Sequence, residues 1–160
     1  MKMRIMFVCH GNICRSPMAE FIMKKLVCEK GLSHKFEISS SATSTEEIFM
    51  GVGNPIYPPA AAELTKRGVP FTKRQATQLK RDDYGCYDLF IGMDSANIRN
   101  MMRILDGDRE RKVHKLLSFA GSDKDVSDPW YSDRFDIAYE DICKGCCGLL
   151  SYILETENDL

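Results

Sequence analysis

The chain contains 160 residues, the usual size of one globular domain built around one hydrophobic core. Hydrophobic residues make up 44% of the sequence and charged residues 28%, and no apolar run is long enough to cross a bilayer, so a membrane-spanning protein is excluded. The formal net charge of -1 excludes the strongly basic character of nucleic-acid-binding proteins. We therefore predict a single domain over residues 1–160, with no membrane or nucleic-acid partner.

The number of cysteines and the N-terminal sequence both bear on the cellular compartment. Seven cysteines indicate free thiols, because the count is odd and reducing compartments keep cysteines reduced. The apolar stretch at the N-terminus is too short for a secretion signal and lacks a small-residue cleavage site. We therefore expect a cytoplasmic protein.

Strand-like and helix-like segments alternate along the chain. The strand segments are short and apolar, whereas the helix segments repeat apolar residues every three or four positions. In chain order the prediction is a strand at 4–8, a helix at 17–30, a strand at 36–38, a helix at 58–67, a strand at 89–93, a helix at 94–102, a weaker strand at 112–117 and a helix at 135–153.

Local signals mark the ends of the first two helices. Ser16 is a suitable N-cap, and Pro17 suits the first helical position because its missing N–H would have no partner there. Gly31 and Gly68 follow the last periodic residues and are expected to close the two helices.

The alternation of strands and helices predicts the α/β class, with a mostly parallel sheet covered by helices on both faces. The strand at 89–93 is nearly all apolar, as expected for a strand buried on both sides. Ligands of such sheets bind beyond the carboxyl ends of the strands. The turn that follows the first strand, residues 9–16, lies at that edge and is the first candidate for a binding site.

The turn at residues 9–16 has the composition of an anion-binding loop. Backbone N–H groups of such a turn and of the helix start point inward, and the Arg15 guanidinium can grip two phosphate oxygens at once. These positive groups favour the thiolate form of Cys9. Ser16 can donate a hydrogen bond to that sulfur, and Asn12 is the loop residue best able to adopt a left-handed conformation. Amides and Arg15 supply the charge that a metal would, so we expect no metal and no organic cofactor.

A thiolate that faces a bound phosphoryl group is placed for in-line attack, which gives a phosphocysteine that water then hydrolyses. The leaving alkoxide needs a proton, and Asp128 is the candidate acid, with a role as base in the second step. Pro129 stiffens its turn, and Trp130 can partly desolvate its carboxyl group. Trp130 and Tyr131 can also wall the entrance against a flat aromatic substrate.

The segment Val8-Cys9-His10-Gly11-Asn12-Ile13-Cys14-Arg15-Ser16-Pro17 resembles the signature of the low-molecular-weight protein tyrosine phosphatases. The resemblance extends along the whole chain. Ser39-Ser40-Ser41-Ala42-Thr43 is similar to the end of the family's second strand, Met93-Asp94 to the end of its third strand, and Asp128-Pro129-Trp130-Tyr131 to its acid loop. The fold implied is a three-layer domain with a central four-stranded parallel sheet in the order 2-1-3-4.

The resemblance also implies residue roles, a substrate class and partners. Cys9 would be the nucleophile, Arg15 the phosphate clamp and Asp128 the general acid, and the loop would be supported by Asn12, Ser16 and Ser40. The phosphate-binding loop would comprise His10, Gly11, Asn12, Ile13, Cys14 and Arg15. The substrates would be phosphotyrosine in proteins and small aryl phosphates, inorganic phosphate or similar oxyanions would also bind the loop, and the protein would be a monomer or weak dimer.

Three further features follow from the resemblance. Cys14 would form a reversible disulfide with Cys9 that protects the nucleophile from overoxidation. The substrate pocket would be formed by Ile13, Trp130 and Tyr131, and the variable stretch 45–52, which faces the substrate in relatives, would add Phe49 or Met50 as an apolar wall. Many members carry a histidine after the second helix that joins the Asn-Ser network, whereas here that region holds Lys73 and Arg74.

Other functions compatible with the same residues are weaker. An arsenate reductase of this fold passes oxidation to two further cysteines, and the corresponding region offers only Cys86. Relatives that hydrolyse phosphoarginine have threonine where this chain has Ile13. A non-catalytic phosphate or phosphopeptide binder would be expected to lack the nucleophile or the acid, and both are present.

Two other groups of residues could be considered as metal ligands, but their spacing does not favour a metal site. Cys143, Cys146 and Cys147 include a CxxC spacing, but they lie on the apolar stripe of a helix and have no second ligand pair, so core packing is favoured. His10 is expected at the pocket rim or toward solvent, where the neighbouring thiols do not provide a metal geometry.

Overall fold

The computed structural model describes residues 2–157. Its helices and strands are, in chain order, β1 (Met3–Cys9), α1 (Arg15–Glu29), β2 (Phe36–Ala42), β3 (Ile48–Phe49), β4 (Val52–Gly53), α2 (Pro58–Lys66), β5 (Leu89–Gly92), α3 (Ser95–Ile104), β6 (Val113–Lys115), α4 (Pro129–Ser132) and α5 (Phe135–Thr156). Short 3-10 helices at Ser33–Lys35, Arg81–Cys86 and Leu116–Ala120 join some of them.

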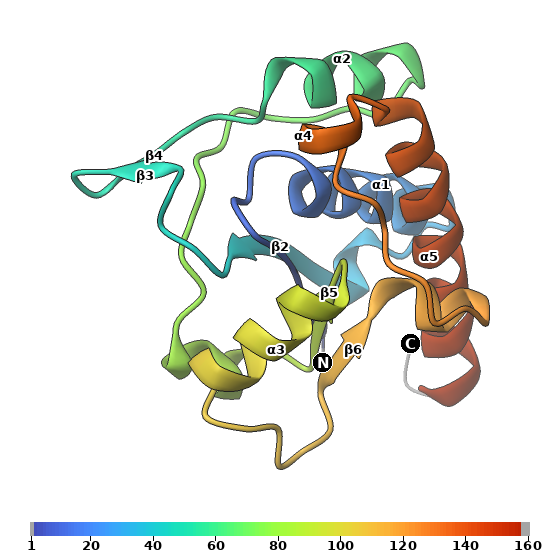
Figure 1. Cartoon of the computed structure of the whole chain (residues 1–160). Coiled ribbons are helices and arrows are strands. Elements are labelled where there is room, and N and C mark those ends of the chain that lie inside the picture. The colour runs from blue at the N-terminus through green and yellow to red at the C-terminus, as the bar shows by residue number, and fades with distance from the viewer. Residues whose placement is uncertain (1, 158–160) are drawn as a thin grey trace.

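The central sheet has four parallel strands in the order β2-β1-β5-β6 (Figure 1). This confirms the predicted α/β class and the predicted order 2-1-3-4, because β5 and β6 are the third and fourth strands of this sheet. Strand β1 lies in the middle and pairs with β2 along its whole length, up to Cys9 opposite Ala42. The nucleophile candidate therefore ends a central strand at the carboxyl edge.

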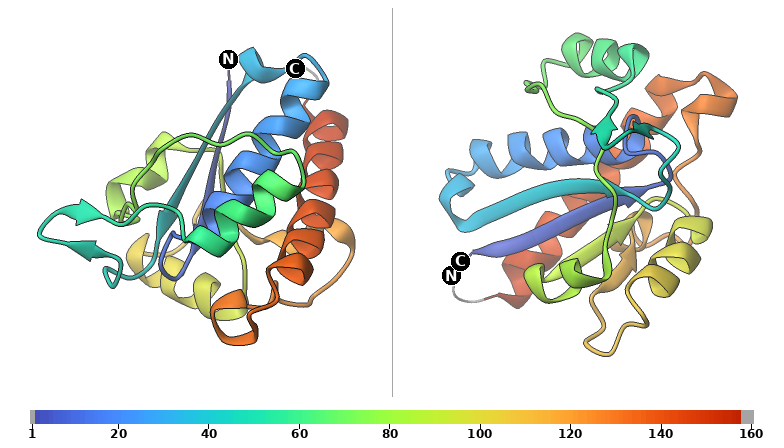
Figure 2. Two further views of the ribbon diagram at one scale, coloured as in Figure 1. Left: turned by 90° about the horizontal axis from the view of Figure 1, so that it is seen from above. Right: turned by 90° about the vertical axis from the view of Figure 1, so that its left-hand side faces the viewer.

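Both faces of the sheet are covered by helices, as Figure 2 shows. Ile5 and Phe7 of β1 are fully buried in a core that α1 and α5 complete. The alternate residues Met6 and Val8 face the other side and pack in a second core with Met101 of α3. This alternation follows from the two-residue period of a strand, and it confirms a sheet between two helical layers.

The start of α1 differs from the prediction. The helix begins at Arg15, so Pro17 occupies its third position and not its first. Cys14 is the N-cap residue, and no side chain caps the helix. The predicted capping role of Ser16 is wrong because its hydroxyl lies 3.0 Å from the Cys9 sulfur and serves the loop instead.

Other boundaries were hard to derive from local pattern. Strand β2 continues beyond the predicted 36–38 through three serines, because pairing with β1 holds those residues extended. The β3–β4 hairpin was not predicted; it projects from the body of the molecule (Figures 1 and 2). Strand β6 is shorter than predicted, since the chain turns into a 3-10 helix at Leu116.

The segment after α2 returns to the sheet edge beside the phosphate loop. The Ala42 N–H donates to the Thr77 carbonyl at 2.7 Å, and the Leu79 N–H donates to the Ala42 carbonyl at 2.8 Å. Residues 74–78 are thereby held against the end of β2. Within residues 2–157, the helices are too short or too polar for any of them to traverse a bilayer.

Candidate active site

The loop between β1 and α1 encloses the Cys9 sulfur, and Cys9 is almost completely buried. The backbone N–H groups of Asn12 and Ser16 donate to Sγ at 3.3 and 3.4 Å. The Ser16 hydroxyl lies 3.0 Å from the same sulfur. Three hydrogen-bonding groups of the loop therefore surround the Cys9 sulfur.

Asn12 supports the loop from inside. Its backbone has φ 59°, the left-handed conformation that asparagine tolerates better than most residues. The side-chain Nδ2 donates to the hydroxyls of Ser16 and Ser40 at 2.8 and 2.9 Å. The Oδ1 atom accepts from the Thr77 N–H at 3.0 Å and from the Arg74 guanidinium. The buried carboxamide thus uses both donors and both acceptor positions.

Arg15 is the cationic side of the loop, and its side chain is only 3% exposed. Its Nη1 donates to Asp94 Oδ2 and to the Val126 carbonyl, both at 2.8 Å. Its Nη2 lies 3.5 Å from Asp128 Oδ2. Burial acts to lower the Arg15 pKa, but the Cys9 sulfur and the two carboxylates act oppositely, and the net result is a raised pKa. The guanidinium therefore stays charged at every working pH.

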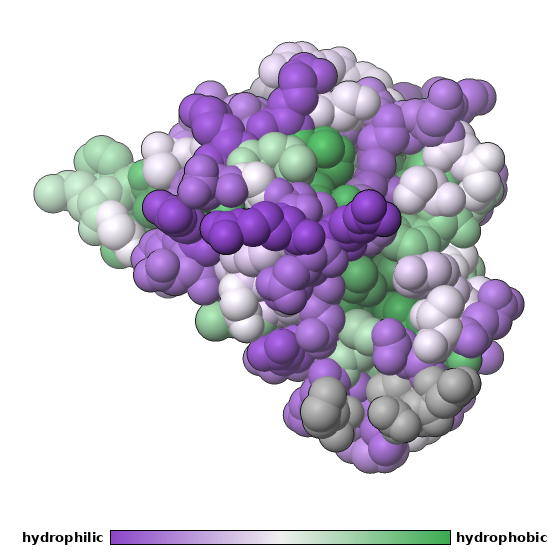
Figure 3. Space-filling view, turned by 90° about the horizontal axis from the view of Figure 1, so that it is seen from below, coloured by the Kyte–Doolittle hydropathy of each residue, from purple (hydrophilic) through white to green (hydrophobic). Residues whose placement is uncertain are grey.

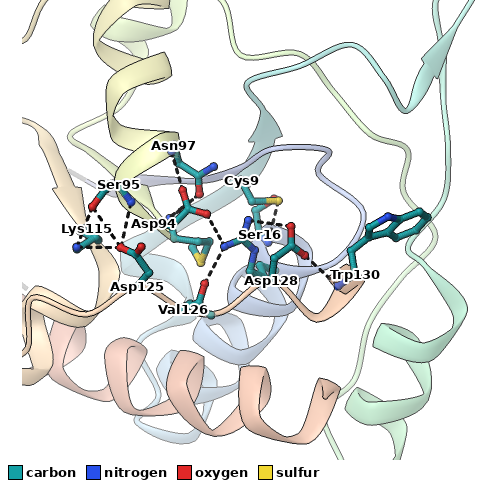
Figure 4. A network of polar contacts seen from close by, with 12 residues as sticks. Cys9, Ser16, Asp94, Ser95, Asn97, Lys115, Asp125, Val126, Asp128 and Trp130 are labelled. Atoms are coloured by element: carbon teal, nitrogen blue, oxygen red, sulfur yellow. Dashed lines mark hydrogen bonds and ion pairs between the residues drawn. The ribbon is translucent and has the colours of Figure 1, made fainter. Parts of the chain in front are cut away.

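Asp94 holds Arg15 in place and also caps α3. Its Oδ1 accepts from the Asn97 N–H at 2.7 Å, and Asn97 Oδ1 in turn accepts from the Asp94 N–H at 3.1 Å. This reciprocal capping fixes the carboxylate that faces Arg15, as Figure 4 shows. Nothing in the local sequence indicated that Asp94 would have a partner 79 residues away.

The loop that carries Val126 and Asp128 is tied to α3. Asp125 Oδ1 accepts from the Ser95 N–H at 3.1 Å and from Lys115 Nζ at 3.0 Å (Figure 4). The Val126 N–H donates to the Met93 carbonyl at 2.9 Å. The strand ends and the loop thus share one rigid hydrogen-bonded edge.

Asp128 lies at the mouth of the site. It caps the short helix α4, where its Oδ1 accepts from the Trp130 N–H at 3.0 Å. Pro129 occupies the first helical position, as expected for a turn that proline stiffens. The second oxygen, Oδ2, faces Arg15, so the carboxyl group borders the space above the loop (Figure 4).

A cavity of about 280 Å³ opens above the loop. Of the predicted site residues, the structure brings to its lining Cys9, His10, Gly11, Ile13, Cys14, Arg15, Asp128, Trp130 and Tyr131. Trp130 is held by Tyr57, with ring centroids 5.1 Å apart. The cavity therefore joins the anion cradle to an aromatic wall.

Phe49 does not line this cavity, in contrast to the prediction. Its side chain is 76% exposed on the β3–β4 hairpin, and Met50 beside it is exposed as well. The hairpin forms the projecting hydrophobic tip at the left of Figure 3. Because β3 and β4 pair with each other and not with the sheet, Phe49, Met50 and Val52 are left exposed, whereas Ile48 packs against the core.

Two acidic residues at the rim were not predicted from the sequence. Glu46 and Glu47 line the cavity, and Glu46 Oε2 lies 3.0 Å from His10 Nε2. They lie in the stretch 45–52 that the resemblance places toward the substrate, but this segment has no helix or strand periodicity that would single out these two residues. His10 lies at the rim, as expected, and is half exposed.

The remaining cysteines differ from Cys9 in their surroundings. Burial, with the neighbouring Cys9 and Asp128, raises the pKa of Cys14 to about 12, so its thiol is protonated at neutral pH. Cys146 is fully buried in the core beneath α1, and burial raises its pKa as well. No group of three or more metal-ligating side chains is brought together in residues 2–157.

A strand-loop-helix anion cradle with a buried cysteine, a buried arginine and an aspartate at its mouth has the geometry to bind a phosphoryl group. The model of the family described as low molecular weight phosphotyrosine protein phosphatase matches residues 4–158. The chain belongs to this family, and it is an enzyme of the protein tyrosine phosphatase class.

Individual relatives agree with the family assignment. The low molecular weight phosphotyrosine protein phosphatase of Gallus gallus is 35% identical over 148 residues, which cover 89% of this chain and 90% of the relative. The crystal structure of YfkJ from Bacillus subtilis superposes with a TM-score of 0.92 at 32% identity and covers 99% of this chain and 98% of that one. The Drosophila arginine phosphatase DARP superposes with a TM-score of 0.84 at 25% identity, over 99% of this chain and 100% of that one.

Substitution of Asp94 tests whether it orients Arg15. We expect Asp94→Asn to lower kcat/KM for p-nitrophenyl phosphate by about 10- to 100-fold, because an arginine without its anchor no longer presents its fork to the phosphate. Asparagine is also a good N-cap, so Asp94→Asn should lose only the charge pairing with the buried Arg15, about 3 kcal/mol of the free energy of unfolding in urea. Asp94→Ala should lose the same activity and about 1 kcal/mol more, because it also removes the cap. Activity of Asp94→Asn within twofold of wild type would contradict the orienting role.

Proposed function

We propose that the protein hydrolyses phosphotyrosine in proteins, and small aryl phosphates, through a phosphocysteine formed on Cys9. The observation that carries the proposal is the Cys9 sulfur itself, buried at the base of the loop with Asn12 N–H, Ser16 N–H and the Ser16 hydroxyl around it. The Arg15 guanidinium lines the same cavity. A nucleophile and a dianion receptor in one cavity are the two requirements of this chemistry.

The first step transfers the phosphoryl group to sulfur. The phosphate oxygens accept hydrogen bonds from the loop amides and from Arg15 Nη2. Asp94 and the Val126 carbonyl continue to accept hydrogen bonds from Nη1. The Cys9 thiolate attacks phosphorus, and the bond to the phenolic oxygen breaks. Asp128 gives its proton to that oxygen as it leaves, which avoids release of a free phenolate.

The second step returns the enzyme to its starting state. Asp128, now a carboxylate, accepts a proton from water, and the water oxygen attacks the phosphorus of the phosphocysteine. The sulfur leaves as a thiolate into the same set of donors that stabilised it before. Inorganic phosphate is released and competes with the substrate for the loop.

Ile13, Trp130 and Tyr131 support a preference for a flat substrate. They form the apolar part of the cavity wall, and an aromatic ring can lie against the Trp130 indole. The likeness to the Drosophila arginine phosphatase makes phosphoarginine the second candidate substrate. Ile13 favours phosphotyrosine, because a branched apolar side chain offers nothing to the N–H groups of a guanidinium.

Cys14 is proposed as the redox partner of Cys9. Peroxide would oxidise the Cys9 thiolate to a sulfenic acid, and the Cys14 thiolate would attack that sulfur and expel hydroxide to give a disulfide. The high Cys14 pKa keeps it protonated during turnover, so it does not compete with Cys9 for phosphorus.

Two variants test the mechanism. Cys9→Ser should lose hydrolysis to the background level, since serine lacks the thiolate that attacks phosphorus. Asp128→Ala should lower kcat by about 10²- to 10⁴-fold for phenyl phosphate and by less for p-nitrophenyl phosphate, whose leaving group needs no proton.

The same assay on phosphotyrosine and phosphoarginine peptides tests which substrate the enzyme prefers. Full activity of Cys9→Ser would overturn the mechanism, and a preference for phosphoarginine would overturn the substrate.

The Cys14 proposal predicts a pH dependence. Because the attacking group is the thiolate and the Cys14 pKa is about 12, the rate of disulfide formation should rise with pH by about tenfold per unit between pH 7 and 9. The measurement is peptide mapping of enzyme quenched after a pulse of excess peroxide. Cys14→Ser is the control and should go on to irreversible overoxidation. A disulfide rate that does not change over this range would contradict the role.

A further inference from the structure

The aromatic wall of the catalytic cavity stands on an exposed segment. Trp130 and the four residues after it are all exposed. Within residues 2–157, the hydrogen bonds of this segment stay between Asp128 and Ala138. A contact between rings connects the segment to a distant part of the chain, because the Trp130 and Tyr57 centroids lie 5.1 Å apart with an interplanar angle of 52°.

Tyr57 is itself held in place on its other sides. Its ring lies 6.0 Å from the ring of Phe135, a buried residue of the main core at the start of α5. Tyr57 is also the N-cap residue of α2, and the proline that follows it stiffens the helix start. Trp130 therefore rests on a ring that two helices fix.

Tyr57 also reaches the opposite wall of the cavity. Its backbone N–H donates to the carbonyl of Ile13 in the phosphate loop at 2.9 Å. Ile13 and Trp130 line the catalytic cavity, whereas Tyr57 is absent from that lining. One residue outside the cavity thus contacts both apolar walls, the first through its backbone and the second through its ring.

We propose that Tyr57 is a positioning residue that fixes Trp130 relative to Ile13 and so sets the slot for the aromatic ring of the substrate. The inference rests on the proposed function, since it concerns the ring of an aryl phosphate. An exposed indole without support samples several rotamers, and ordering it when the substrate binds costs affinity. Aromatic rings at this separation and tilt attract each other, so Tyr57 orders Trp130 before the substrate arrives.

The test compares two ligands by titration calorimetry. Inorganic phosphate occupies only the anion cradle, whereas benzylphosphonate, in which a methylene group replaces the ester oxygen of phenyl phosphate, also places a ring in the slot. Tyr57→Ala should weaken benzylphosphonate binding by about tenfold and leave phosphate binding unchanged. Tyr57→Phe keeps the ring and should bind both ligands as the wild type does. Tyr57→Leu keeps apolar bulk over the core without a flat ring, and it should show the selective loss even if Tyr57→Ala does not fold.

A matched control and a spectroscopic signature accompany the binding test. Tyr152→Ala removes a tyrosine from a ring pair of the same tilt, 52° at 5.2 Å from Phe119, and neither residue lines the cavity. Both affinities should stay unchanged in this variant. Trp130 is the only tryptophan of the chain, so intrinsic fluorescence reports on it directly. Tyr57→Ala and Tyr57→Leu should increase quenching of that fluorescence by acrylamide, and Tyr152→Ala should not.

The two ligands separate positioning of the slot from general damage to the fold. An equal loss of affinity for both ligands in Tyr57→Leu, or an unchanged affinity for benzylphosphonate, would overturn the proposal. So would a wild-type enzyme that binds benzylphosphonate no tighter than phosphate. In turnover, Tyr57→Leu should raise KM for p-nitrophenyl phosphate and leave kcat unchanged. Because the calorimetry involves no turnover, its failure is distinct from failure of the phosphatase mechanism, which activity in Cys9→Ser would reveal.

Discussion

Hydrogen bonds from inward-facing groups to the buried Cys9 sulfur are the interaction on which the rest of the site depends. A thiolate removed from water is costly unless donors replace the lost hydration, and a bound phosphate adds further negative charge beside it. The donors are backbone N–H groups, and they converge only because the chain reverses at Asn12 in a left-handed conformation. The four hydrogen bonds of the Asn12 carboxamide hold that conformation.

The same cost explains why residues far apart in the chain meet at this edge. Arg15 is a buried cation, and Asp94 and Val126 supply acceptors from the ends of two other segments. A parallel sheet with all its strand ends on one side brings these segments together, with β1 in the middle. The fold therefore supplies hydrogen-bond partners to Arg15 as the loop supplies them to Cys9, so both groups are held in place before any substrate arrives.

Features carried by neighbouring residues could be predicted from the sequence. The strand, glycine turn and helix around Cys9 and the aspartate-proline turn at Asp128 are local patterns, and the structure places both at one cavity. Features that depend on competition between hydrogen-bond partners, or on contacts between distant parts of the chain, could not be predicted. Ser16 is a suitable N-cap by local rules, but its hydroxyl hydrogen-bonds with the Cys9 sulfur instead. Phe49 suits an apolar wall, but the hairpin carries it outward.

The contacts of Asp94, Glu46 and Arg74 could not be predicted from the local sequence either. Each reaches the site only through the folded chain, and none belongs to a local motif that names its partner. The resemblance indicated that the region of Lys73 and Arg74 differs from many relatives, but only the structure distinguishes the two, because Lys73 is exposed and Arg74 contacts Asn12.

The most direct test of the mechanism is to trap the phosphoryl group on the enzyme. Asp128→Ala accepts the phosphoryl group from p-nitrophenyl phosphate, whose leaving group needs no acid, but lacks the base that activates water. The intermediate should therefore accumulate after rapid quenching, and peptide mass spectrometry should find one phosphoryl group on the peptide that contains Cys9. A phosphoryl group on another residue, or none on any peptide while product is still released, would contradict the phosphocysteine mechanism.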